Sequence, residues 1–383
     1  MFSNNFKFLA KSNVIIGNGT VRNLHKIIKE RGYTKPLFIV DEGFIKSFLW
    51  KKIYKKINSN FNKIKIVITS GKSEPTYNTL RKNLFESKKT KCDLIVGIGG
   101  GSCLDTAKAI AALIKNKGDP IIYRGFNKIK KKGIPTICIP TTAGTGSEAS
   151  FNASFVDENS NIKMGINGKN MFSTLSILDG ETTLSCPYFA SVGAAIDALA
   201  HIVEGYVCKN SNEFSDMLAE IGFKYIVDSI IDLKSKKGNI NKRLNLLKGA
   251  YLSGIVQMNS GSGIASAISY PLSVYYGVPH GIGGGMFLIY IAKYNYSKKF
   301  DKYKYLGKYL KLKKKSSSLS LINHLQRIFD RLNVPKKLHH FGIYKNDYSN
   351  LIKIMKTQQP AFDQNPIKFS VNKDFRKMIK KFL

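Results

Sequence analysis

The sequence predicts an α/β half built on a parallel sheet, followed by an all-helical half. Three observations predict this division. From residue 13 to about residue 184, apolar runs of strand length alternate with amphipathic helical stretches, which is the rhythm of βαβ units. From Ala190 onward, apolar residues recur at the spacing of one helix face instead. A chain of 383 residues is also longer than one compact core usually needs.

Five apolar runs are expected to form the strands of this sheet. They are residues 14–16, 36–40, 64–69, 94–98 and 136–139. Helical patterns fill the gaps between them. Because strands that are joined by helices run in the same direction, the sheet is expected to be parallel.

The change of pattern near Pro187 marks the expected domain boundary. It divides the chain into residues 1–186, the α/β domain, and residues 187–383, the helical domain. No Gly/Ser-rich linker marks this point. The two halves are therefore expected to pack against one another, with a cleft between them.

The net charge of +36, from 61 Lys and Arg against 25 Asp and Glu, raises the question of a polyanionic partner. The lysines are spread along the chain without a nucleic-acid-binding motif, so no specific nucleic acid is expected. A non-catalytic protein that binds polyanions through its charge remains an alternative of a different class. A basic exterior would also draw an anionic small-molecule substrate.

Nothing in the sequence indicates a membrane or secreted protein. No run of about 18 apolar residues is present, and residues 1–11 lack the apolar core of a secretory signal. The cysteines are odd in number and have no CxxC spacing; they are Cys92, Cys103, Cys138, Cys186 and Cys208. A cytoplasmic protein with reduced, packed cysteines is expected.

A glycine run follows the fourth expected strand. It consists of Gly99, Gly100 and Gly101 with Ser102, and Asp105 lies in the helical run beyond. Consecutive glycines let the backbone approach a ligand closely, and the free N–H groups at a helix start favour an anion such as a phosphate. A plain tight turn would explain the glycines as well. The absence of GK[ST] argues against a kinase or ATPase loop.

A second polar loop follows the fifth expected strand. Its hydroxyl groups belong to Thr141, Thr142, Thr145 and Ser147. So many hydroxyls and exposed amides on one short loop suit a polar ligand better than a core. Asp41 ends the second expected strand, where a carboxylate can bind a ribose hydroxyl and so favour NAD over NADP. A helix N-cap is the other interpretation of Asp41.

Three longer segments resemble the iron-containing alcohol dehydrogenase family: GIGGGSCLDTAKAIA at residues 97–111, PTTAGTGSEAS at residues 140–150 and DALAHIVEGY at residues 197–206. VPHG at residues 278–281 and NP at residues 365–366 extend the resemblance over essentially the whole chain. It implies a Rossmann-like dinucleotide-binding domain and an all-α domain in a dehydroquinate synthase-like architecture. It also implies NAD as cofactor, a metal between the domains and a homodimer.

The resemblance implies roles for individual residues. The nucleotide contacts would fall on Asp41, on the two polar loops and on Lys163. A divalent iron or zinc ion would be held by Asp197 and His201, which lie one helical turn apart on one face, and by His280. Without the resemblance, the first two are equally a polar helix pair, and His280 is equally a turn residue.

One expected metal ligand is missing. The resemblance places a third histidine fourteen residues before His280, where this chain has Ser266. A further histidine four residues later is replaced by Tyr270. Asp197, His201 and His280 still form a three-ligand set that leaves a position open, as a catalytic metal requires.

The expected function is NAD-dependent interconversion of an alcohol and an aldehyde or ketone by hydride transfer, assisted by the metal. In a metal-free oxidoreductase, Tyr270 or His280 would serve as the proton donor. An enzyme like dehydroquinate synthase or glycerol-phosphate dehydrogenase is a further alternative within the same architecture.

Overall fold

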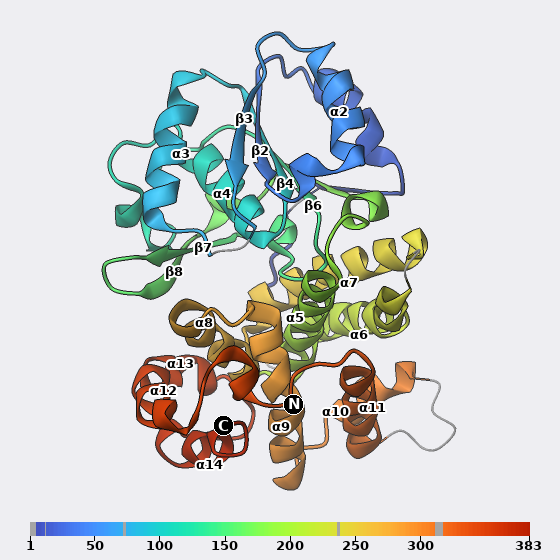
Figure 1. The fold of residues 1–383 in the computed structure, drawn as a ribbon, viewed down its shortest axis with the longest axis vertical. Coiled ribbons are helices and arrows are strands. Elements are labelled where there is room, and N and C mark those ends of the chain that lie inside the picture. The colour runs from blue at the N-terminus through green and yellow to red at the C-terminus, as the bar shows by residue number, and fades with distance from the viewer. Residues whose placement is uncertain (1–4, 12, 72–73, 236–237, 311–316) are drawn as a thin grey trace.

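The structure is a computed structural model that describes residues 5–11, 13–71, 74–235, 238–310 and 317–383. Figure 1 shows two parts: strands with their covering helices in the upper part, and a bundle of longer helices in the lower part. Pro187, where the sequence predicts a domain boundary, immediately precedes the first long helix of the lower part.

A six-stranded parallel sheet forms the framework of the first half, in the order β1-β9-β6-β4-β2-β3. Its strands are β1 (Asn13–Ile16), β2 (Pro36–Asp41), β3 (Lys65–Thr69), β4 (Leu94–Gly99), β6 (Thr136–Pro140) and β9 (Leu175–Leu178). The helices of this half are α1 (Leu24–Glu30), α2 (Phe48–Asn58), α3 (Tyr77–Lys89) and α4 (Gly101–Leu113). The predicted parallel sheet is therefore confirmed.

The central strands are apolar along their length because helices cover both faces of the sheet. Leu37 and Ile39 of β2 pack toward α3 and α4, whereas Phe38 and Val40 pack toward α1 and α2. This alternation follows from the two-residue period of a strand. A strand that is buried on both faces has no polar side, as in the sequence LIVGIG of β4.

A second, smaller sheet was not predicted. It has three strands in the order β5-β8-β7, with β5 (Gly125–Phe126), β7 (Asn152–Asp157) and β8 (Ile162–Asn167). The hairpin of β7 and β8 is antiparallel and mixes polar with apolar residues, so it carries no continuous apolar run. The four-residue strand β9 was missed as well, because a run so short gives little periodicity.

The second half is helical, as predicted. Its helices are α5 (Tyr188–Val207), α6 (Glu213–Val227), α7 (Ile240–Ser260), α8 (Ile264–Tyr276), α9 (His280–Ser297), α10 (Tyr303–Leu306), α11 (Ser318–Arg331), α12 (Tyr348–Met355), α13 (Gln359–Phe362) and α14 (Arg376–Ile379). One apolar cluster unites them, and α5 is buried along almost its whole length. Because α5 is central, its polar residues Asp197, His201 and Glu204 are buried as well.

Parallel register brings the carboxyl ends of the strands to one edge of the sheet. Asp41 at the end of β2 lies opposite Thr69 of β3, and Gly99 at the end of β4 lies opposite Pro140 of β6. Ligands of open parallel sheets bind at this edge. The glycine run and the threonine loop therefore emerge side by side, facing the helical half.

The cysteines are all free, and Cys103, Cys138 and Cys208 are buried. Burial raises the pKa of the Cys103 thiol to about 12, so this group is unreactive at neutral pH. Among the described residues, no helix combines the length and the apolar character that crossing a membrane requires.

Candidate functional site

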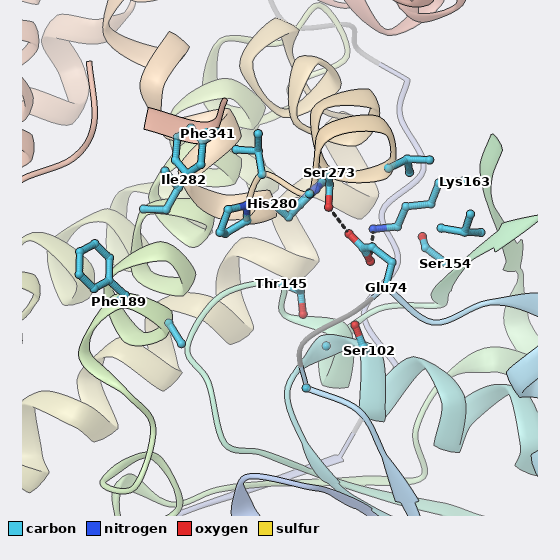
Figure 2. A pocket seen from close by; sticks show the side chains of 18 of the residues that line it. Glu74, Ser102, Thr145, Ser154, Lys163, Phe189, Ser273, His280, Ile282 and Phe341 are labelled. Atoms are coloured by element: carbon cyan, nitrogen blue, oxygen red, sulfur yellow. Dashed lines mark hydrogen bonds and ion pairs between the residues drawn. The ribbon is translucent and has the colours of Figure 1, made fainter. Parts of the chain in front are cut away.

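A cavity of about 1380 Å³ lies between the sheet edge and the helices. Its walls come from both halves of the chain: the start of α4, the hairpin of β7 and β8, the start of α5, the turn between α8 and α9, and residues 330–341. Figure 2 shows side chains from these segments around it, with His280, Ile282 and Phe341 close to one another. A cavity with walls from two domains is the usual place for a cofactor and its substrate.

The glycine run opens a helix at the cavity wall. Gly100 is the N-cap of α4, and Gly101 and Ser102 line the cavity. A Cβ atom on Gly101 would lie 2.7 Å from the side chain of Thr145, and one on Gly99 would lie 2.5 Å from Cys103. Only glycine fits these positions, so the backbone N–H groups at the start of α4 stay open to an anion.

The threonine loop divides into two groups. Thr145 lines the cavity, whereas Thr141 and Thr142 lie outside its lining, beside Arg243. The hydroxyl of Ser147 points inward and donates a 2.5 Å hydrogen bond to the Asp105 carboxylate.

Asp105 braces the loops that carry the predicted cofactor contacts. Besides the bond from Ser147, it accepts a 2.9 Å hydrogen bond from the backbone N–H of Ser154 on β7. Asp105 also lines the cavity. Its carboxylate thus joins α4, the threonine loop and β7 around the same space.

Asp41 is a neighbour of the cavity. Its Oδ1 atom accepts a 2.8 Å hydrogen bond from the backbone N–H of Gly43, in the way that a capping carboxylate does. The other oxygen, Oδ2, would lie 2.5 Å from a Cβ atom on Gly71, and Gly71 lines the cavity. The Asp41 carboxylate therefore orders the turn that follows β2 and lies next to a residue of the cavity lining; Gly43, not Asp41, is the N-cap of the short helix that follows.

The three predicted metal ligands lie near one another, and His280 lines the part of the cavity that we call its inner end. The Nε2 atom of His201 lies 3.6 Å from Oδ1 of Asp197, and the Nε2 atom of His280 lies 4.0 Å from the same oxygen. Burial and nearby Lys163 lower the pKa of His280 to about 4, so this imidazole is neutral at pH 7. Neutral imidazole nitrogens and a carboxylate oxygen are the donors that iron and zinc take.

These donors fit a metal in kind. Both distances are too long for hydrogen bonds and close to the separation of about 3.4 Å between two ligands that bind one ion at about 2.1 Å. As the side chains stand, however, no three His, Cys, Asp or Glu residues in the described part of the chain are gathered tightly enough to hold an ion. The Nδ1 atom of His201 is also buried and has no hydrogen-bond partner among the described residues. The set is therefore an open one that would have to tighten around a metal.

Ser266 is hydrogen-bonded to a different acidic residue. Its hydroxyl donates a 2.6 Å hydrogen bond to Oε2 of Glu204, a buried residue of α5. Burial raises the pKa of Glu204, although the bonds from Ser266 oppose this shift. The Ser266 hydroxyl therefore binds the carboxylate of Glu204. Glu204 follows His201 by three residues on the same helix, but it was not predicted as a site residue.

Tyr270 and Lys163 lie next to His280. The ring of Tyr270 meets the imidazole of His280 edge to face at 4.7 Å, and the Nζ atom of Lys163 lies 5.1 Å from the centre of the tyrosine ring. Burial raises the pKa of Tyr270, which keeps its hydroxyl protonated. A protonated phenol and a neutral imidazole are thus packed together at the inner end of the cavity.

Three further polar residues near His280 were missed by the sequence analysis. Ser269 has its Oγ atom 3.1 Å from Nδ1 of His280. Glu74 forms a 2.8 Å ion pair with Lys163 and accepts a 2.9 Å hydrogen bond from Ser273. These residues belong to no recognisable motif, and packing alone brings them to the site.

Comparison with family models and with known proteins identifies sequences that are similar to this chain. A family model described as "Iron-containing alcohol dehydrogenase" matches residues 11–180, and its C-terminal counterpart, "Fe-containing alcohol dehydrogenase family, C-terminal", matches residues 191–382. The chain is 33% identical over 286 residues to alcohol dehydrogenase 4 of Schizosaccharomyces pombe, covering 73% of this chain and 66% of that protein. It is 26% identical to the NAD-dependent methanol dehydrogenase of Bacillus methanolicus, covering 88% and 90%.

The fold is also similar to solved structures. The crystal structure of a 1,3-propanediol oxidoreductase superimposes with a TM-score of 0.90 at 22% identity, covering 99% of this chain and 100% of that one. At this identity the match supports the fold alone.

Proposed function

Because the chain belongs to the iron-containing alcohol dehydrogenase family, we propose that it interconverts an alcohol and an aldehyde or ketone with NAD in the cavity between its two halves. The observation that carries this proposal is the meeting of three features in one space: a glycine-opened helix start, the threonine loop and His280. NAD would bind near the helix start and the threonine loop, and the alcohol or carbonyl compound would bind near His280, in the same cavity. The related enzymes dehydroquinate synthase and glycerol-phosphate dehydrogenase are weaker alternatives, because both halves match models of the alcohol dehydrogenase family.

The cofactor would bind along the sheet edge. Its pyrophosphate would receive hydrogen bonds from the backbone at Gly101 and Ser102, where the α4 dipole adds to the attraction. Thr145 would contribute its hydroxyl, and Asp41 would accept hydrogen bonds from the adenosine ribose. His280 lines the same cavity as these residues, so cofactor and substrate would share this space.

In the oxidation direction, bound NAD would supply the acceptor for the hydride of the carbinol C–H bond, and the hydroxyl proton would leave to a base or to water. The products are the carbonyl compound, NADH and a proton, so the step balances. In a metal-free site, neutral His280 would accept a hydrogen bond from the substrate hydroxyl, and Tyr270 lies against it. In carbonyl reduction without a metal, Tyr270 or His280 would return the proton.

Asp197, His201 and His280 would hold the divalent iron or zinc ion. When bound, such an ion supplies positive charge that lowers the pKa of the substrate hydroxyl. The homodimer and the cytoplasmic location that the sequence analysis expects remain parts of this proposal.

The test is NAD-linked absorbance at 340 nm with the purified full-length chain. Primary alcohols are offered with NAD, and the matching aldehydes with NADH, before and after incubation with Fe²⁺ or Zn²⁺. Turnover with at least one pair is the expected result. Salt-dependent binding to a polyanion without any NAD-linked turnover would instead favour the non-catalytic alternative.

A further inference from the structure

The cavity lining lacks the large excess of positively charged residues that the whole chain has. The chain has 61 Lys and Arg and a net charge of +36. Of the described residues that line the cavity, only two are Lys and none is Arg, and they face three carboxylates. The lysines are Lys163 and Lys336, and the carboxylates belong to Glu74, Asp105 and Asp330. Although the protein is strongly basic, the lysines that line this cavity do not outnumber its carboxylates.

Both lysines are paired with a carboxylate. Lys163 lies 2.8 Å from Oε2 of Glu74, and Lys336 lies 2.8 Å from Oδ1 of Asp330. The two pairs differ in exposure: the side chains of Lys163 and Glu74 are 10% and 21% exposed, against 70% and 42% for Lys336 and Asp330. Charges act strongly on a ligand only where water does not screen them. The pair of Glu74 and Lys163 therefore acts on a ligand in the cavity more strongly than the exposed pair of Lys336 and Asp330 does.

Glu74 is held in place from both domains. Lys163 of β8 contacts one carboxylate oxygen, and Ser273 of α8 donates a 2.9 Å hydrogen bond to the other (Figure 2). Burial alone would raise the pKa of Glu74, but the charge of Lys163 and the hydrogen bonds from Lys163 and Ser273 favour the ionised carboxylate, and the pKa lies below its ordinary value. Glu74 is accordingly ionised at neutral pH.

The pair lies beside the inner end of the cavity, where the proposed reaction takes place. Lys163 covers the ring of Tyr270, and that ring packs on His280. Without Glu74, the ammonium group of Lys163 would attract the anionic group of a substrate whose carbonyl oxygen lies at His280. With Glu74 present, the charge of Lys163 is neutralised, and the anionic group of such a substrate would be repelled by the Glu74 carboxylate. The pyrophosphate of the dinucleotide would be bound at the start of α4.

We infer that Glu74 is a specificity-determining residue that reserves the cavity for uncharged alcohols and aldehydes and disfavours anionic ones. This inference rests on the proposed function and names its substrate class. It runs against the expectation from overall charge alone, because a substrate responds to the unscreened charges of the cavity and not to the lysines on the exterior.

The experiment compares propanal with sulfoacetaldehyde, which carries a sulfonate in place of the methyl group. The ratio of their kcat/KM values is measured at saturating NADH for the wild type, Glu74→Gln and Asp330→Asn. Glutamine keeps the shape and the acceptor oxygen but removes the charge. Asp330→Asn removes the same charge from the exposed pair and is the matched control. A ratio within one enzyme cancels any change in cofactor affinity or active fraction.

The wild type is expected to prefer propanal by at least about tenfold, and Glu74→Gln to reduce that preference by about tenfold, which corresponds to 1.4 kcal/mol. Asp330→Asn should change the ratio by less than about threefold because its pair is screened. A wild type that reduces sulfoacetaldehyde as well as propanal overturns the inference, and this result stands even if Glu74→Gln does not fold. An unchanged ratio in folded Glu74→Gln overturns it too. If the wild type reduces neither aldehyde nor any other carbonyl compound, the proposed function itself fails.

Discussion

The hydroxyl of Ser266 is hydrogen-bonded, at 2.6 Å, to the carboxylate of Glu204 on the neighbouring helix. The same carboxylate accepts the backbone N–H groups of Gly263, Ala265 and Ser266 at distances of 2.6 to 3.3 Å. Glu204 of α5 thus caps the start of α8, and the serine side chain completes the cap. The position at which the family resemblance expects a metal ligand has a structural task in this chain.

Replacing this serine should cost stability without changing metal binding. Ser266→Ala removes one hydrogen bond to a buried carboxylate, which is worth roughly 1.5 to 3 kcal/mol. Urea unfolding measures the cost. Ser260→Ala is the matched control, because Ser260 is equally buried but its hydroxyl has no hydrogen-bond partner among the residues that the structure describes. Loss of bound metal in Ser266→Ala, with stability intact, would show that the serine is a ligand after all.

Metal binding should depend on the residues around Asp197. Asp197→Ala and His201→Ala are each expected to weaken Zn²⁺ binding by at least roughly tenfold, because three ligands leave none to spare. Equilibrium dialysis against Zn²⁺ gives the affinities. His340→Ala, which removes an exposed histidine of the cavity wall, should bind like the wild type. A wild type that binds no Zn²⁺ or Fe²⁺ would leave the metal-free mechanism with Tyr270 and His280.

Glu148 should make the protein less stable as the pH rises. Burial raises the pKa of this carboxyl from 4.5 to about 7, and within the described part of the chain its Oε1 atom has no hydrogen-bond partner. The unfolded chain loses the proton near pH 4.5, whereas the folded chain keeps it to about pH 7. Stability is therefore greatest below pH 4.5 for this group and falls by about 3 kcal/mol by the time the pH exceeds 7.

Glu148→Gln should remove this slope and be the more stable protein at pH 8. Urea unfolding at several pH values between 4 and 8 measures it. Glu30→Gln changes an exposed glutamate of α1 and should keep the pH dependence of the wild type. Parallel curves for the wild type and Glu148→Gln would contradict the prediction.

Asp41 should set the preference for NAD. Asp41→Asn keeps an acceptor for the N–H of Gly43 but removes the charge that repels a 2′-phosphate. The ratio of kcat/KM for NADP to that for NAD is expected to rise by roughly tenfold, equivalent to about 1.4 kcal/mol. Glu42→Gln removes the adjacent charge and should leave the ratio near its original value. An equal rise in both variants would indicate a general charge effect instead.

Several features of the site could be predicted from the sequence, because they are set by residues that are close to one another along the chain. The glycines before α4 follow a buried strand directly, so a helix start at that point could be predicted. Asp197 and His201 share a helix face by spacing alone. Their approach to His280, within 4.0 Å of Asp197, needed the packing of α5 on α9 as well.

Residue identity and local periodicity determined the parallel sheet, the helical half, the glycine-opened helix start and the lack of a histidine at position 266. Only the tertiary structure decided that Ser266 bonds to Glu204, 62 residues away, and that Glu74 meets Lys163 and Ser273, which are 89 and 199 residues distant. The physical reason is that a hydrogen bond or an ion pair between distant segments leaves no periodic trace in the sequence. Such contacts exist only after the apolar faces of the sheet and helices have packed and brought these segments together.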